Sequence, residues 1–151
     1  MTKNRIVIII PTYNNYRTTI DLISKLLEQS FQGFDIIIVD DGSEDWRYIR
    51  DFVEKKKLCD RITIIRLYRN MGPGSAFRVG MMYAIEKNYD VLILNDNDSF
   101  PLDKDLIESL VKHVERDDSK VYYPINFLYP YHGRKRKIPP QLFVIPSTVV
   151  R

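Results

Sequence analysis

Short apolar segments alternate along the chain with longer stretches in which apolar residues recur at helical spacing. The short segments cover residues 5–10, 34–39, 61–67 and 91–94, and apolar segments of this length are typical of strands buried on both faces. In the longer stretches, a spacing of three or four residues predicts amphipathic helices. The positions that carry this spacing are Tyr16, Ile20, Ile23 and Leu27, then Ile49, Phe52 and Val53, then Leu106, Leu110 and Val114.

This alternation predicts an α/β fold with a Rossmann-like, mostly parallel central sheet and helices on both of its faces. A further helix is expected at residues 75–87, and the helix that carries Leu106, Leu110 and Val114 is expected at residues 103–116. Because crossovers between parallel strands are right-handed, the carboxyl ends of these strands should share one rim of the sheet. A length of 151 residues suits a single domain, residues 1–151, with a hydrophobic core of its own.

Three of the predicted strands run into polar, turn-forming residues at that rim, and the last of them is followed by Asp96 and Asp98. In an extended chain, residues two apart project to the same side, so both carboxylates could reach one cation. Oxygen ligands of this kind suit Mg²⁺ or Mn²⁺, and open α/β sheets bind ligands at this rim. The alternative is an ordinary turn in which Asp96 acts as a cap.

Four motifs in series resemble the family 2 glycosyltransferases of GT-A fold, in the nucleotide-diphospho-sugar transferase superfamily. The match runs over residues 5–110 and continues more loosely over residues 121–151. The resemblance implies transfer of a sugar from a nucleoside diphosphate sugar, uridine-linked, to an acceptor hydroxyl, with inversion and with Mn²⁺ or Mg²⁺. The motifs are residues 7–14, residues 38–43, Asn70 to Gly74 with Arg78, and Asp96 to Asp98.

The resemblance places the first two motifs against the base and ribose of the donor. The residues it assigns there are Pro11, Thr12, Tyr13 and Asn14, then Asp41, Gly42 and Ser43. Tyr13 would offer a flat surface to the base, and Asp41 would accept the N–H of a uracil-type base, which selects as well as binds. Asp40 is explained by capping the turn that follows it.

The third motif opens a helix, and helix amino ends favour anions through their free N–H groups. The resemblance therefore assigns Asn70, Gly74 and Arg78 to the donor, together with Asp96, which also holds the metal ion with Asp98. Family members often carry Ala-Arg-Asn in this helix, whereas this chain has an inserted Phe77 before Arg78 and then Val79. The alternative for Arg78 is a helix arginine that faces solvent.

An inverting transferase also needs a general base to take the proton from the acceptor hydroxyl. In the family this carboxylate follows a strand that residues 141–146 resemble, but no Asp or Glu follows Asp118 here. The part of the domain that faces the acceptor is therefore expected to be short or truncated. His132 is a candidate base, and a plain loop residue is its alternative.

Two other functions stay open at this point. A catalytically silent module that binds a nucleotide sugar or assists assembly would also lack the carboxylate. A nucleotidyltransferase would show a glycine-rich loop with a basic residue after the first strand, and residues 11–14 do not match that pattern.

Composition indicates the cellular compartment and restricts the possible partners. One cysteine, Cys59, excludes an internal disulfide and indicates a reducing cytoplasm. No apolar run approaches the roughly 20 residues of a membrane span, and a net charge of +3 is too small to indicate a nucleic-acid partner. The sequence does not decide whether the acceptor is a glycan, a lipid or a protein, or whether the chain forms a homo-oligomer. The chain has a run of four basic residues, which consists of Arg134, Lys135, Arg136 and Lys137. This run could attract an anionic membrane surface, and the alternative is a solvated loop.

Overall fold

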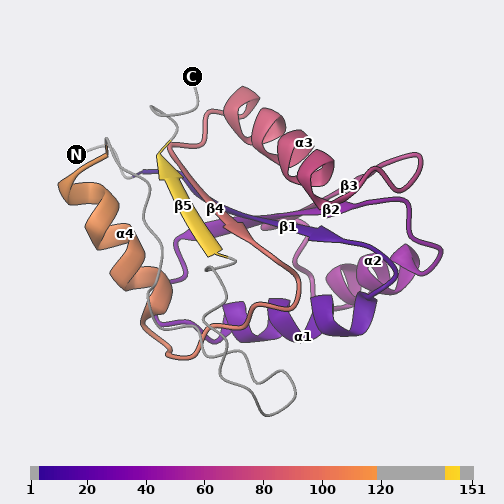
Figure 1. Cartoon of the computed structure of the whole chain (residues 1–151). Coiled ribbons are helices and arrows are strands. Elements are labelled where there is room, and N and C mark those ends of the chain that lie inside the picture. Colours follow the sequence, from indigo (N-terminus) through magenta and orange to yellow (C-terminus); the bar gives the residue numbers. More distant parts are fainter. Residues whose placement is uncertain (1–3, 119–141, 147–151) are drawn as a thin grey trace, which may run out of the picture.

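The computed structural model describes residues 4–118 and 142–146, which contain five strands and four helices (Figure 1). The elements are β1 (Ile6–Thr12), α1 (Tyr16–Leu27), β2 (Phe34–Asp40), α2 (Trp46–Lys55), β3 (Ile62–Arg66), α3 (Pro73–Glu86), β4 (Val91–Asn95), α4 (Leu106–Arg116) and β5 (Leu142–Pro146). Each helix expected from the sequence is present. The third begins two residues earlier than predicted, because Pro73 fits the first helical position, where no N–H is needed.

The strands form one sheet in the order β3-β2-β1-β4-β5. β1 pairs in parallel with β2 and β4, and β2 pairs in parallel with β3, so these four strands end at the same edge. β5 pairs antiparallel to β4. The prediction of a mostly parallel α/β sheet is confirmed, and β1 lies at its centre.

The sheet separates two hydrophobic layers, which confirms the prediction of helices on both faces (Figure 1). Alternate β1 side chains face opposite layers, as the pleat of a strand requires. Ile8 packs with residues of α1, α2 and α4, whereas Ile9 packs with residues of α3. Both are fully buried, and each such side chain contributes roughly 1.5–3 kcal/mol relative to an exposed one.

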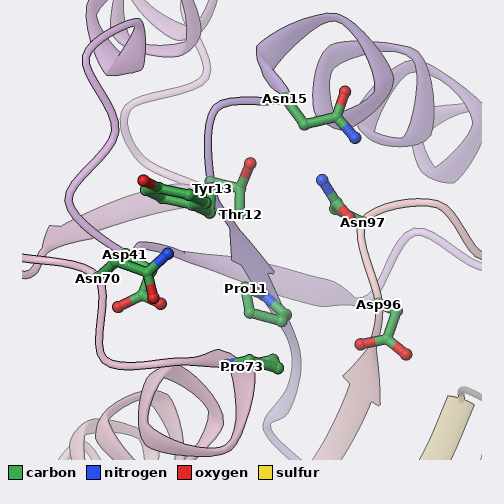
Figure 2. A pocket seen from close by; sticks show the side chains of 9 residues that line it. All are labelled: Pro11, Thr12, Tyr13, Asn15, Asp41, Asn70, Pro73, Asp96 and Asn97. Atoms are coloured by element: carbon green, nitrogen blue, oxygen red, sulfur yellow. The ribbon is translucent and has the colours of Figure 1, made fainter.

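α3 lies very close to the sheet because it carries a glycine where it crosses β1 and β2. A Cβ at Gly80 would overlap Cγ2 of Ile9 and would lie 3.2 Å from Cγ2 of Val39. The close packing fixes the helix against the strands. Its first residue, Pro73, thereby reaches the edge at which β1 and β2 end (Figure 2).

None of the helices within residues 4–118 is long and apolar enough to cross a membrane.

Candidate functional site

A cavity of about 230 Å³ opens where β1, β2 and β4 end (Figure 2). This is the edge at which open parallel sheets bind ligands. Its volume lies below the 300 Å³ or so at which pockets for whole small molecules begin, so it suits one part of a larger ligand. The lining residues are Pro11, Thr12, Tyr13, Asn15, Asp41, Asn70, Pro73, Asp96 and Asn97.

The structure brings six of the residues predicted from sequence into this one cavity: Pro11, Thr12, Tyr13, Asp41, Asn70 and Asp96. Six others lie outside the lining: Asn14, Gly42, Ser43, Gly74, Arg78 and Asp98. Sequence reasoning missed Asn15, Pro73 and Asn97. Each of these three directly adjoins a predicted residue or motif, so adjacency was the available signal.

Tyr13 forms an aromatic wall of the cavity. Its side chain is drawn beside the ends of β1 and β2 (Figure 2), and the residue is 47% exposed, which leaves a ring surface for a ligand. Thr12 is buried beneath it, and its hydroxyl lies 2.8 Å from that of Thr19. The Thr12 carbonyl already accepts the N–H of Asp41 at 2.8 Å, so this backbone group primarily joins β1 to the loop after β2.

Asp41 joins two loops of the cavity wall. It is buried, and its Oδ1 and Oδ2 accept the N–H groups of Met71 at 2.7 Å and Gly72 at 2.8 Å. Beside it, Gly42 has φ +80° and packs so tightly that a Cβ would lie 2.7 Å from the backbone of Arg69. Each carboxylate oxygen has two lone pairs, so a ligand N–H would be a second bond to an occupied acceptor.

The prediction that Asp96 and Asp98 lie in an extended segment is wrong, because they lie in a turn. β4 ends at Asn95, and the Ser99 N–H donates to the Asp96 carbonyl at 3.1 Å, which closes a turn. The turn forms because the Asn95 side-chain amide donates to the carbonyls of Asp96 and Ser99, at 2.7 and 3.0 Å. Asp96 is half-buried and lines the cavity, whereas Asp98 is exposed and lies outside the lining.

The negative charges of Asp96 and Asp98 nevertheless interact. Burial, and then the charge of Asp98, raise the pKa of Asp96 above its usual range. In the preceding residue, Asn95, the side-chain Oδ1 is buried and accepts no hydrogen bond from the described part of the chain. A cation bound to Asp96 would therefore relieve an unfavourable concentration of oxygen charge.

Of the three residues predicted to bind an anion near the start of α3, only Asn70 lines the cavity. Its Oδ1 accepts the Gly72 N–H at 3.0 Å. Gly74 is exposed, and a Cβ built on it would meet no atom within 4 Å beyond its own neighbours and the adjoining backbone of α3. Arg78 is exposed on α3, which matches the alternative of a helix arginine facing solvent. His132 and the basic run at residues 134–137 lie outside the described residues.

A mostly parallel sheet in this order, with a polar and aromatic cavity where its central strands end, defines an α/β protein of the kind that binds nucleotide ligands. The model of the family described as "Glycosyl transferase family 2" matches residues 7–147. The chain therefore belongs to this family, as the four motifs indicated.

Curated relatives agree with this membership. Over 116 residues, 76% of this chain, it is 34% identical to an uncharacterized glycosyltransferase of Rickettsia felis. Over 112 residues, 73% of the chain, it is 30% identical to an N-acetylglucosaminyltransferase of Azorhizobium caulinodans. These matches span 18% and 27% of the two relatives, so the chain corresponds to a minor part of their length.

Solved structures show the same fold. The chain aligns over 97% of its length with a mannosyltransferase of Pyrobaculum calidifontis in complex with GDP-Man and Mn²⁺, with a TM-score of 0.79 and 16% identity. It aligns over 95% with S. aureus TarS in complex with UDP-GlcNAc, with a TM-score of 0.76 and 19% identity. Each alignment covers 46% of the solved chain. The fold is thus that of GT-A glycosyltransferases.

Proposed function

We propose that the cavity binds the nucleoside diphosphate part of a sugar donor, and that the chain serves transfer of that sugar to an acceptor hydroxyl. The observation that carries this proposal is the convergence of Tyr13, Asp41 and Asp96, from three strand ends, on one cavity in a family 2 chain. An aromatic surface, a hydrogen-bond acceptor and a carboxylate for a cation are what the base and the diphosphate of a donor need.

The nucleoside end of the donor would lie against Tyr13 and Asp41. The tyrosine ring stacks on a base, while Asp41 accepts the N–H of a uracil-type base in addition to its two backbone bonds. Because an unpaired donor at a buried base edge is costly, this acceptor favours uridine over guanosine. The solved relative with UDP-GlcNAc supports a uridine donor, while the one with GDP-Man shows that this fold also accepts guanosine.

The diphosphate end requires a cation. Among the described residues, the cavity is lined by two carboxylates, Asp41 and Asp96, and by no lysine, arginine or histidine. An anionic diphosphate would be repelled by such a lining. A divalent ion bound by Asp96 and Asp98 reverses this balance, and it would neutralise the charge that develops on the leaving diphosphate.

The residues of the turn fit Mg²⁺ or Mn²⁺. The oxygen groups available at the turn are the carboxylates of Asp96 and Asp98, whose charges interact. The described residues contain no group of three or more His, Cys, Asp or Glu that could hold a metal by themselves. Magnesium-type sites commonly use one or two carboxylates and take further ligands from substrate phosphates, which suits this arrangement.

A donor-binding module without transfer activity is the second candidate. It is favoured by one observation, that residues 119–151 contain no Asp or Glu to act as the general base. His132 stays the candidate base from the sequence. The acceptor, the single-domain organisation, and membrane contact through residues 134–137 also stay predictions.

The proposal is tested by calorimetric titration of the 151-residue chain with uridine, thymidine and guanosine diphosphates in the presence of Mn²⁺. UDP should bind more tightly than GDP, and TDP should also bind because thymine has the same N–H. Asp41→Ala should weaken UDP binding by at least about 1 kcal/mol, the scale of one hydrogen bond to a charged group.

Glu44→Ala is the matched control, because it removes an exposed acid from the same loop. Its effect on UDP binding should be small. Tighter binding of GDP than of UDP, or equal losses in the two variants, would contradict the assignment of the base site.

A further inference from the structure

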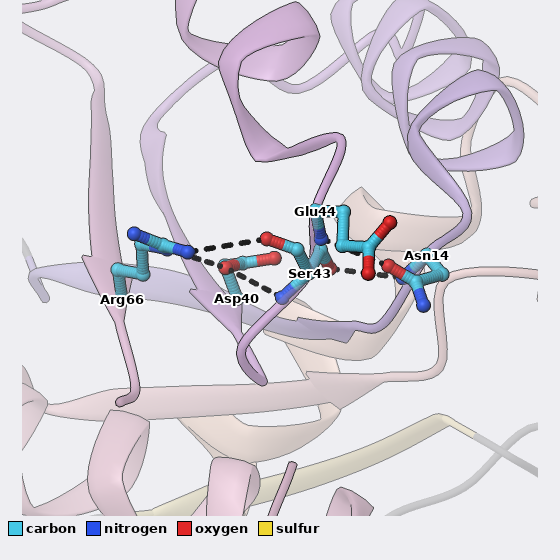
Figure 3. Close-up of polar contacts among 5 residues, drawn as sticks. All are labelled: Asn14, Asp40, Ser43, Glu44 and Arg66. Carbon is cyan, nitrogen blue, oxygen red and sulfur yellow. Dashed lines mark hydrogen bonds and ion pairs between the residues drawn. The ribbon is translucent and has the colours of Figure 1, made fainter. Parts of the chain in front are cut away.

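The cavity wall is supported by a buried carboxylate that does not itself reach the cavity. Asp40, the last residue of β2, is fully buried, and Figure 3 shows its polar contacts. Its Oδ2 accepts the Ser43 N–H at 3.2 Å and lies 3.4 Å from Nε of Arg66, while its Oδ1 accepts no hydrogen bond from the described residues. Burial raises its pKa, against the opposing effects of Ser43 and Arg66. A buried carboxylate in this position depends on its one ion-pair partner.

Arg66 reaches that carboxylate from the end of the neighbouring strand β3. Its Nη2 donates to the Ser43 carbonyl at 3.3 Å, so a single guanidinium binds both the carboxylate and the loop that the carboxylate caps (Figure 3). The guanidinium also stacks over Trp46, 5.0 Å from the ring centroid, at the start of α2. These contacts fix the position of the loop between β2 and α2 relative to β3.

The same loop fixes the residue that follows Tyr13. The Asn14 N–H donates to Oγ of Ser43 at 2.9 Å, and Oδ1 of Asn14 accepts the Glu44 N–H at 3.0 Å (Figure 3). Asn14 has φ +46°, a left-handed conformation that costs a non-glycine residue roughly 1 kcal/mol and that asparagine tolerates best. These two bonds stabilise that conformation of Asn14, which lies between the cavity-lining residues Tyr13 and Asn15.

A continuous set of contacts therefore runs from Arg66 to both nucleoside-binding elements of the proposed site. Asp40 precedes Asp41 in the chain, and Ser43 bonds the residue next to Tyr13. We propose that Arg66 is a positioning residue that holds the loops after β1 and β2 in the arrangement that presents Tyr13 and Asp41 to the donor. This inference rests on the proposed function, and it adds a residue that does not line the cavity.

The physical reason is the cost of leaving Asp40 buried without a counter-charge. Without Arg66, the carboxylate would take up a proton or turn toward water, and either change weakens its bond to the Ser43 N–H. Ser43 would also lose the bond to its carbonyl. The loop would then sample other positions, and the left-handed Asn14 would lose its support.

The test compares Arg66→Gln with Arg61→Gln. Arg61 is a matched control at the opposite end of β3, since it also stacks on a ring, Phe34 at 5.5 Å, and also donates to backbone carbonyls. Binding of UDP with Mn²⁺ is measured by calorimetry, and unfolding by denaturant. Arg66→Gln should weaken UDP binding by about tenfold, the scale on which partners of ligand-binding residues act. Arg61→Gln should change it less than about twofold, even if it destabilises the fold equally.

Two further variants separate positioning from general destabilisation. Arg66→Lys keeps the charge beside Asp40 but loses the forked geometry, so it should recover part of the affinity. In a double-mutant cycle, Asp40→Asn combined with Arg66→Gln should cost less than the sum of the single changes, because the two residues act on the same loop. Full additivity, or no rescue by lysine, would overturn the proposal.

Amide shifts of the ligand-free protein give a readout that does not need the donor. Arg66→Gln should shift the amide resonances of Asn14, Asp41 and Ser43, whereas Arg61→Gln should leave them in place. If no nucleoside diphosphate binds the wild-type chain but these amides shift, the proposed function fails and the positioning role stands. If UDP binds the wild type and Arg66→Gln alike, the positioning role fails and the proposed function stands.

Discussion

The two carboxylates of the cavity wall, Asp41 and Asp96, are in different electrostatic situations. Asp41 accepts two backbone N–H groups, from Met71 and Gly72. For Asp96, both burial and the neighbouring Asp98 disfavour the charged form. A bound cation would therefore be stabilised more by Asp96 than by Asp41, because the Asp41 oxygens already accept hydrogen bonds from the loop at residues 70–72. This difference is why we assign the metal to one carboxylate and the base to the other.

For single residues of the site, we predict that Asp96→Asn and Asp98→Asn each weaken Mn²⁺-dependent UDP binding strongly, on the order of 10–100-fold. Asp103→Asn is the control, because this exposed acid lies in the next turn and its backbone carbonyl, not its side chain, bonds Gln29. Calorimetry with and without Mn²⁺ measures all three. Equal small effects would rule out the metal assignment.

Asp96→Asn should also leave the ligand-free protein at least as stable as the wild type. The raised pKa means that the fold disfavours the Asp96 charge, so a neutral side chain of the same shape removes a penalty at neutral pH. Denaturant unfolding measures this. A clear loss of stability would instead indicate that Asp96 serves the fold.

The chemically distinctive residues of the site could be predicted from sequence, whereas their partners could not. Asp41, Asp96 and Tyr13 follow predicted strands, and strand ends meet at one edge. The partners of Asp41 lie thirty residues downstream, and no spacing rule reports them. The turn at Asp96 depends on side-chain bonds from Asn95, which compete locally with an extended strand. Arg66 was missed because an arginine at a strand end carries no pattern of its own.

Among the elements, α3 is the one whose placement depends on a single residue. The other helices show amphipathic spacing and were predicted from it, but α3 is covered by small residues where it meets the sheet, with Ala76, Gly80 and Ala84 buried. The direction of β5 was not predictable either. A strand's own apolar pattern does not state whether its partner runs parallel or antiparallel, and β5 reverses the direction of the other four.

We predict that Gly80→Ala destabilises the protein by about 1–3 kcal/mol, because the added methyl group overlaps Ile9 and α3 must move away from the sheet. Gly74→Ala, in the same helix, is the control. It has open space around its Cβ position, and alanine favours the helix, so it should be neutral or stabilising by up to about 1 kcal/mol. Denaturant unfolding measures both. Equal effects of the two changes would contradict the close packing of α3.

In the whole molecule, the proposed donor site is concentrated at one edge of the described sheet. The cavity draws its lining from β1, the loop after β2, the loop before α3 and the turn after β4. The chain nevertheless corresponds to less than half of the solved structures that it matches. We therefore predict donor binding and sugar transfer separately for this chain.

We predict that the 151-residue chain binds or slowly hydrolyses a uridine diphosphate sugar more readily than it transfers the sugar. A positioned general base contributes about 10²–10⁴-fold, and no carboxylate follows Asp118 to supply it. The measurement supplies the donor, Mn²⁺ and an array of acceptors, then compares free sugar with glycoside. Efficient glycoside formation would mean that a base lies among residues that we read as structural, and His132→Ala would be the first variant to examine.

The central claim is that one cavity holds a nucleoside against Tyr13 and a metal-bound diphosphate at Asp96. The most direct test is calorimetric titration of the wild-type chain with UDP and with uridine, each with and without Mn²⁺. If the ion bridges Asp96 and the diphosphate, Mn²⁺ should strengthen UDP binding by at least about tenfold, or 1.4 kcal/mol, and leave uridine binding unchanged. Equal UDP binding with and without Mn²⁺, or the same response to Mn²⁺ for uridine as for UDP, would contradict the account.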